Sequence, residues 1–164
     1  MRPQLNIRLT LLDLAVEFAG WLGLIALLLL PYIVYSSLPE TIPIHFDGAG
    51  HPDNYTGSSG IYLLPIIGAT AFIALTIINY FPHMFHYPVR ITNENALTHY
   101  TFATRLIRYT KLAVVVVFFV IVHRIYQIAI GVHEGLGFAF YPLLVILVTL
   151  PLAFYLFKIF VRTQ

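Results

Sequence analysis

The sequence predicts an all-α integral membrane protein with four transmembrane helices. Of its 164 residues, 59% are hydrophobic and only 10% are charged, whereas a soluble domain carries roughly a quarter charged residues. Four segments approach the ~20 apolar residues that a helix needs to cross ~30 Å of hydrocarbon. Lysine and arginine also occur in alternate connections between these segments, as the positive-inside rule expects of a multi-pass protein.

The four spans are expected at residues 15–35, 61–80, 112–131 and 138–157 of a single membrane domain, 1–164. The first apolar run is too long for the h-region of a cleaved signal peptide, and no A-x-A-like site follows it. We therefore expect it to be retained as a helix. Proline inside these runs predicts kinks, which membrane helices tolerate.

Positive charge predicts which side of the membrane each connection occupies. Lysine and arginine are present in the N-terminal tail, in residues 81–111 and at the C-terminus, but are absent from residues 36–60 and 132–137. Basic connections remain in the cytoplasm. We therefore expect both termini in the cytoplasm and the 36–60 loop outside.

A long third helix is expected to extend from the membrane into the cytoplasm. Neither glycine nor proline occurs between Asn93 and Gly131, and such a helix is nearly twice as long as the hydrocarbon is thick. Thr92 is the expected N-cap. Residues 93–111 are predicted to form an amphipathic cytoplasmic part of this helix.

Basic residues mark the cytoplasmic interface of this helix. Arg105, Arg108 and Lys111 are predicted to anchor it there, with a contact to anionic lipid or protein as the alternative. Asp13 and Glu17 lie four residues apart on one helical face, and are expected to pair with Arg105 or Arg108. Binding of a cation or proton relay is the alternative for these two carboxylates.

Composition also argues against several classes of function. The chain contains no cysteine, which excludes disulfides and thiolate chemistry. Its formal net charge of +2 is too small to indicate a nucleic-acid partner. The sequence has no H-E-x-x-H motif, nucleophile elbow or phosphate-binding glycine loop. An enzymatic role is left open, and a non-enzymatic role is favoured.

The 36–60 loop contains the pattern H-x-D-x₃-H-x-D, formed by His45, Asp47, His51 and Asp53. Imidazole and carboxylate ligands suit Zn²⁺ or a similar divalent ion. The turn-forming residues between the two pairs predict a hairpin that would bring them together. The other interpretation is a short ordered loop, in which His45 donates to the backbone and Asp53 caps a turn.

Arg124 is unusual because it lies inside the third predicted span. It follows Lys111 by 13 positions, which places it ~20 Å deeper along the helix. A lone cation within a membrane is costly unless it snorkels or pairs. We predict that Arg124 reaches outward to a carboxylate or to carbonyls of the 36–60 loop, with plain snorkelling as the alternative.

Three stretches of the sequence together resemble a known family. They are LPETIPIHFDGAGHPDNY at 38–55, FPHMFHYPVRITNENALTHY at 81–100 and ATRLIRYTK at 103–111. They are similar to a bacterial membrane family of unknown biochemical function that forms the N-terminal module of SdpI-type immunity proteins. The matching residues of the first two stretches are Leu38, Pro39, Ile42, Pro43, His45, Phe46, Asp47, Gly50, Pro52, Asp53, Tyr87, Pro88, Ile91, Thr92, Glu94, Asn95 and Tyr100.

The resemblance implies a function at the cell envelope. Named members of the family resist a secreted toxic peptide, and some sequester a repressor at the membrane. We therefore expect a non-enzymatic protein of peptide-toxin immunity or envelope-stress signalling in the bacterial cytoplasmic membrane. Its expected partners are the lipid bilayer and a secreted peptide or a cytoplasmic regulator. The resemblance selects His45, Asp47, Gly50 and Asp53 in the loop, and does not cover His51.

Two other functions are kept as alternatives. One is a metal-dependent membrane enzyme or metal-binding protein that uses the histidines and aspartates of the 36–60 loop. The other is a small transporter subunit with Asp13, Glu17 and Arg124 in its pathway. Zinc or another divalent metal belongs to the first alternative alone, and no cofactor is otherwise expected. Four short spans leave little interior for a pore, so a homo-oligomer is a further expectation.

Overall fold

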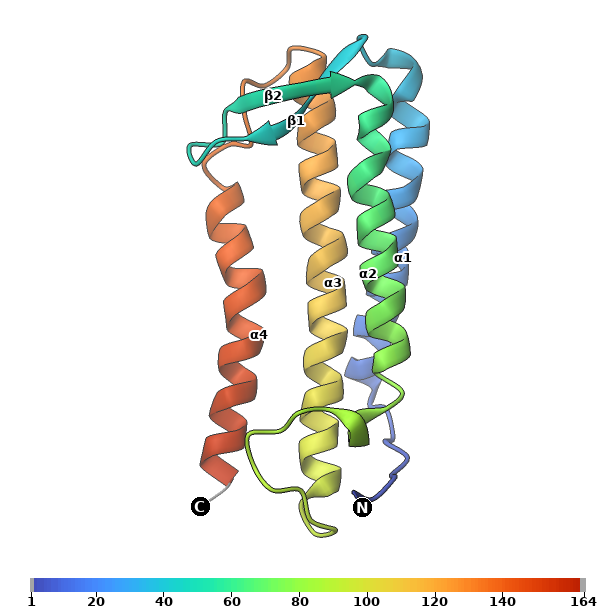
Figure 1. The fold of residues 1–164 in the computed structure, drawn as a ribbon, viewed down its shortest axis with the longest axis vertical. Coiled ribbons are helices and arrows are strands. Elements are labelled where there is room, and N and C mark those ends of the chain that lie inside the picture. The colour runs from blue at the N-terminus through green and yellow to red at the C-terminus, as the bar shows by residue number, and fades with distance from the viewer. Residues whose placement is uncertain (1, 163–164) are drawn as a thin grey trace.

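Four long helices run side by side in the computed structural model, which describes residues 2–162, with side chains described for residues 2–158 (Figure 1). With the 3₁₀ turns that adjoin the first two, all four are long and apolar enough to cross a membrane, which confirms the prediction of four helices of spanning length and composition. The helices are α1 (Leu11–Val34), α2 (Leu63–Ile78), α3 (Ala96–Ala129) and α4 (Phe140–Arg162).

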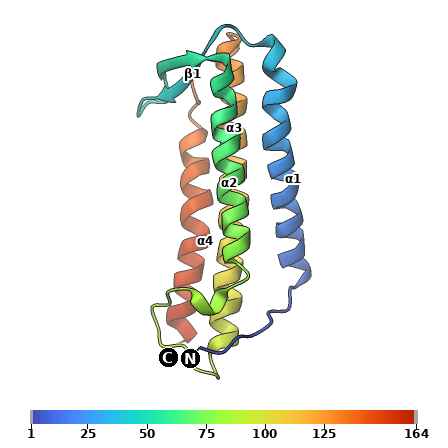
Figure 2. The ribbon, with the colours of Figure 1, turned by 45° about the vertical axis from the view of Figure 1, so that its right-hand side comes forward.

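A two-stranded antiparallel hairpin connects α1 to α2. Its strands are β1 (Thr41–Phe46) and β2 (Pro52–Gly57), so the hairpin that the turn residues predicted is confirmed. It lies across one end of the helices, whereas both termini lie at the other end (Figures 1 and 2). We call these the hairpin end (residues 36–60 and 124–141) and the terminal end (residues 2–17 and 76–111).

The first helix begins at Leu11, four residues before the predicted start of its span. The reason is a capping box, in which Thr10 accepts a hydrogen bond from the N–H of Asp13 while the Asp13 carboxylate accepts from the N–H of Thr10. This reciprocal pair satisfies two backbone donors that a helix start otherwise leaves free.

The third helix is continuous over 34 residues, from Ala96 to Ala129, as the absence of glycine and proline predicted. It begins three residues later than expected, with Asn95 rather than Thr92 as the N-cap. Thr92 and Asn95 instead exchange hydrogen bonds in the preceding turn, from the N–H of Thr92 to Asn95 Oδ1 at 2.8 Å and from the N–H of Asn95 to Thr92 Oγ1 at 3.4 Å.

The central position of α3 determines the core. It packs against α1, α2, α4 and β1, and the buried residues Leu27, Phe72 and Val115 meet in the contact between the first three helices. Gly68 permits a close approach there, because a methyl group in its place would lie 2.8 Å from Leu27 Cδ2 and 2.9 Å from Phe118 Cδ2. Small residues at such crossings are typical of membrane helices, whose backbones must approach closely to pack.

The fourth helix packs chiefly against α3 and leaves most of its side chains exposed. A small apolar cluster of Val117, Leu136 and Phe140 joins it to α3 near the hairpin end. The remaining surface of α4 is apolar, as suits a helix whose solvent is lipid.

Candidate functional site

The turn of the hairpin is organised by Asp47. Its Oδ1 accepts hydrogen bonds from the backbone N–H groups of Ala49 and His51, each at 2.9 Å, and its own N–H donates to the carbonyl of His51 at 2.9 Å. These bonds hold the pKa of the Asp47 carboxyl below its ordinary value, with the bond from His51 as the largest cause. Asp47 therefore acts as the cap of the turn, the role that we had expected of Asp53.

His45 and Asp53 form a separate pair across the two strands. His45 Nδ1 lies 2.5 Å from Asp53 Oδ1, and both side chains are largely exposed. His45 therefore bonds to a carboxylate. This corrects the expectation that His45 donates to the backbone. An exposed pair of this kind contributes little to stability.

The four residues of the H-x-D-x₃-H-x-D pattern do not converge on one point. In the second pair, His51 Nδ1 lies 3.8 Å from Asp47 Oδ2. The carboxylate of Asp47 already accepts the backbone hydrogen bonds of the turn. Among the residues that the structure describes, no group of three or more histidine, aspartate or glutamate side chains is placed to hold a metal ion. The four side chains thus form two separate pairs, His45 with Asp53 and His51 with Asp47, and not the four-ligand site that their spacing allowed.

The hairpin turn is joined to the α3–α4 connection and to the first turn of α4 by hydrogen bonds to two of its backbone carbonyls. The N–H of Leu136 donates to the carbonyl of Gly50 at 3.0 Å, and the Tyr141 hydroxyl donates to the carbonyl of Asp47 at 3.3 Å. Gly50 has φ +85°, a conformation that favours glycine. Gly135 must also be glycine, because a methyl group there would lie 2.5 Å from the Gly50 carbonyl oxygen.

A recess of about 470 Å³ lies beside this junction, with Arg124 in its wall. The hairpin turn contributes Gly50 and His51 to the recess, and the α3–α4 connection contributes His133 and Glu134. Arg124 Nη1 donates to Gln127 Oε1 of its own helix at 3.2 Å. Among the described side chains, Arg124 forms neither the predicted ion pair with a carboxylate of the 36–60 loop nor the predicted hydrogen bond to a carbonyl of that loop, although it lies beside the hairpin turn in the wall of the recess.

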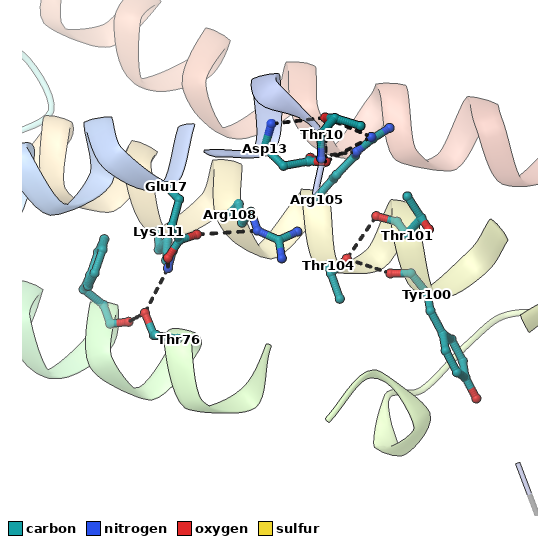
Figure 3. Close-up of polar contacts among 11 residues, drawn as sticks. Thr10, Asp13, Glu17, Thr76, Tyr100, Thr101, Thr104, Arg105, Arg108 and Lys111 are labelled. Carbon is teal, nitrogen blue, oxygen red and sulfur yellow. Dashed lines mark hydrogen bonds and ion pairs between the residues drawn. The ribbon is translucent and has the colours of Figure 1, made fainter. Parts of the chain in front are cut away.

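The terminal end carries a buried polar cluster between α1 and α3 (Figure 3). Asp13 is only 5% exposed. Arg105 donates two hydrogen bonds to its carboxylate, from Nε at 2.8 Å and from Nη2 at 3.1 Å. The expected pairing of Asp13 with an α3 arginine is confirmed. Asp13 both caps α1 and joins it to α3.

Glu17 makes the second link of this cluster. Its Oε1 accepts a hydrogen bond from Lys111, and its Oε2 lies 3.5 Å from Arg108 Nε. Lys111 is 1% exposed, donates to Thr76 Oγ1 at 3.0 Å and lies 4.6 Å from the centre of the Phe72 ring. Arg108 and Lys111 therefore face the bundle interior, which corrects their expected role as interface anchors.

The transporter alternative required Asp13, Glu17 and Arg124 to share a pathway. Arg124 is 19 positions beyond Arg105 on the same helix, a separation of ~28 Å along its axis. Over the described side chains, the buried core between the two ends is apolar and includes Leu24 and Val122. The structure therefore places these charged groups at opposite ends and not along one path.

Several contacts could not be identified from the sequence. Thr76 and Lys111 meet because α2 and α3 cross there, and periodicity within one helix does not reveal its neighbour. The bond from the N–H of Leu136 to the carbonyl of Gly50 joins two backbone atoms, which every residue has. The Tyr141 hydroxyl likewise bonds to a backbone carbonyl, that of Asp47. A glycine at 135 is consistent with a close backbone approach. Several other glycines in this chain could equally have had that role, so the sequence does not identify the contact.

Comparison with known proteins points to the hairpin region. Residues 22–69 match the family model described as "Domain of unknown function (DUF1648)". This range contains the later part of α1, the whole hairpin and the start of α2. The observed chain is thus a membrane-type protein that is similar, over this range, to a family of unknown function.

A distant archaeal relative is also similar to the chain. An uncharacterised protein of Archaeoglobus fulgidus is 34% identical over 83 residues, which cover 44% of this chain and 45% of the relative. The chain therefore spans less than half the length of the relative that it matches. No solved structure matches the chain. These comparisons name no activity, and they do not specify immunity or signalling.

Proposed function

We propose that this chain is a non-enzymatic, SdpI-like membrane protein that confers immunity to a secreted peptide or signals its presence. The observation that carries the proposal is the recess at the hairpin end, where the hairpin turn, Arg124 and the α3–α4 connection meet. The resemblance of the three sequence stretches supplies the biological class, and the recess supplies a place for a ligand.

The recess has the size and polarity of a binding site. Its volume of about 470 Å³ lies within the ~300–1,000 Å³ typical of ligand pockets. Arg124 uses one of its N–H groups for Gln127, which leaves others in the recess for an acceptor. Because a guanidinium binds carboxylates in a two-pronged geometry, a carboxylate of a secreted peptide suits this site.

The proposal includes an orientation and partners. The hairpin end faces outward and both termini face the cytoplasm of a bacterial inner membrane, in keeping with the distribution of lysine and arginine. A cytoplasmic regulator would contact the terminal end. The exposed apolar surface of α4 is where a second copy of the chain would pack if the protein is a homo-oligomer.

A complementation assay tests this proposal. A deletion strain that carries wild-type protein, Arg124→Gln or Arg90→Gln is exposed to peptides fractionated from culture medium, and the inhibitory concentration is measured. Arg90 is an exposed cation at the terminal end, so its substitution is the matched control. We expect the Arg124 variant to lose about tenfold in resistance, the scale of one charge-assisted hydrogen bond.

The proposal fails if deletion of the gene changes neither peptide resistance nor envelope-stress signalling. It also fails in its choice of site if the Arg124 and Arg90 variants behave alike at equal expression.

A further inference from the structure

A small, partly open cavity lies at the terminal end, between the first three helices. Its volume is about 140 Å³, and its wall includes Glu17 of α1, Thr76 and Asn79 at the end of α2, and Arg108 and Lys111 of α3. Glu17, Thr76, Arg108 and Lys111 are labelled in Figure 3, where Lys111 lies between Glu17 and Thr76.

The charges around this cavity do not balance. Asp13 is matched by Arg105, and Glu17 is matched by Lys111, which also bonds to Thr76. Arg108 is the third cation, and no third carboxylate accompanies it in the described cluster. The buried cluster therefore carries one excess positive charge, which a low-dielectric setting makes costly.

Arg108 is also short of hydrogen bonds. It is 8% exposed, and its Nε has no hydrogen-bond partner among the described residues. Its contact with Glu17 spans 3.5 Å and is an ion pair without a hydrogen bond. Since a guanidinium has five N–H groups, a buried arginine in this state has donors left for an acceptor in the cavity that it lines.

Asn79 provides a second group without a partner. Its Oδ1 is buried and unpaired within the described residues, and the residue lines the same cavity. Rotation of the amide by half a turn exchanges its oxygen and nitrogen, so that Asn79 can present an NH₂ donor to an anion.

The cavity lies where the apolar parts of three helices end. Glu17 is close to the start of α1, Asn79 is the C-cap of α2, and Lys111 directly precedes the apolar stretch of α3 that starts at Leu112. In a bilayer this level is the boundary between hydrocarbon and headgroups, where lipid phosphates lie.

We infer that this cavity binds one phosphate group, held by Arg108 and Asn79. The phosphate belongs to a lipid headgroup of the adjacent leaflet or to a free phosphate ion. A volume of about 140 Å³ is below the ~300 Å³ of ordinary ligand pockets, which suits a single phosphate group. Glu17 does not oppose the anion strongly, because Lys111 neutralises its carboxylate.

Native mass spectrometry of the full chain in detergent tests the inference. The probes are dioleoylphosphatidylglycerol, dioleoylglycerol, which has the same acyl chains without phosphate, and inorganic phosphate. We expect the phospholipid to bind wild type and Arg90→Gln equally, and Arg108→Gln at least about tenfold more weakly. Dioleoylglycerol should not bind. Competition by inorganic phosphate that depends on Arg108 would assign the site to the free ion.

A second variant makes the test independent of the folding of Arg108→Gln. Asn79→Asp places a carboxylate in the cavity wall beside the excess cation. We expect this variant to exclude the phospholipid and to raise the melting temperature of delipidated protein. The inference is overturned if Arg108→Gln binds phosphatidylglycerol like wild type, or if Asn79→Asp binds it undiminished.

Discussion

Asp47 illustrates how a residue that resembles a metal ligand can serve the backbone instead. Aspartate side chains commonly accept bonds from N–H groups two to four residues ahead, which mimics a further turn of the chain. In this loop Oδ1 of Asp47 accepts two such bonds, so the carboxylate stabilises the turn. The same residue types therefore fit two roles, and only the geometry of the loop distinguishes them.

Substitution of Asp47 should loosen the turn selectively. In Asp47→Ala the N–H groups of Ala49 and His51 lose their acceptor, and their amide hydrogens should exchange faster by mass spectrometry or NMR. In Asp47→Asn the acceptor oxygen remains, so exchange should stay close to that of wild type. Equal exchange in the two variants would show that the carboxylate does not organise the turn.

The turn should also respond to acid in a defined direction. The pKa of Asp47 is lowered in the folded turn, so its contribution to stability is present above the unfolded value of 3.8 and is lost as the pH falls through the lower, folded pKa. Asp47 should therefore remain ionised down to about pH 4 and protect the amides of Ala49 and His51 from exchange. Below that pH, protonation of Asp47 should accelerate their exchange. Asp47→Asn should lack this acid-dependent step.

Between elements, side-chain ion pairs join α1 to α3 at the terminal end, and hydrogen bonds to backbone carbonyls join the hairpin to the α3–α4 connection and to α4 at the hairpin end. The pairing of Asp13 with an arginine of α3 was predictable, because a buried carboxylate needs a cation and few were available in the chain. The interior position of Lys111 was not predictable, since its place before an apolar stretch is also the usual place of an interface anchor.

A double-mutant cycle measures the contact between α1 and α3. Asp13→Asn and Arg105→Gln each remove one partner of a largely buried, two-pronged ion pair. We expect a coupling energy of about 2 kcal/mol in the free energy of unfolding, measured in mixed micelles. The pair Asp13→Asn and Arg90→Gln should be additive, because Arg90 lies elsewhere. A coupling energy near zero for the first pair would contradict the assigned contact.

Gly135→Ala should detach the α3–α4 connection from the hairpin. The added methyl group would lie 2.5 Å from the carbonyl oxygen of Gly50, and relief of that clash breaks the bond from Leu136. The opening free energy at the Leu136 amide should fall by roughly 1–2 kcal/mol in hydrogen exchange. Gly48→Ala is the control, because a methyl group at Gly48 would meet nothing within 4 Å.

For the whole molecule, patterns that extend over many residues predicted the structure better than the types of individual polar residues did. The four apolar spans, the hairpin between the first two and the unbroken third helix followed from length, charge and the positions of glycine and proline. The division of polar groups between two distant ends did not, because it depends on which helices are neighbours. The distribution of lysine and arginine predicts the orientation of this molecule, with the hairpin end outside.

The orientation that we propose has the hairpin end of a membrane-spanning bundle facing outward. Because the chain has no cysteine, single cysteines report accessibility without background. Tyr55→Cys replaces a side chain that is 58% exposed on β2, and Glu94→Cys replaces an exposed one at the terminal end. A membrane-impermeant maleimide should label Tyr55→Cys on intact cells and label Glu94→Cys only after the membrane is opened. Labelling of Glu94→Cys on intact cells, with Tyr55→Cys protected, would contradict this orientation.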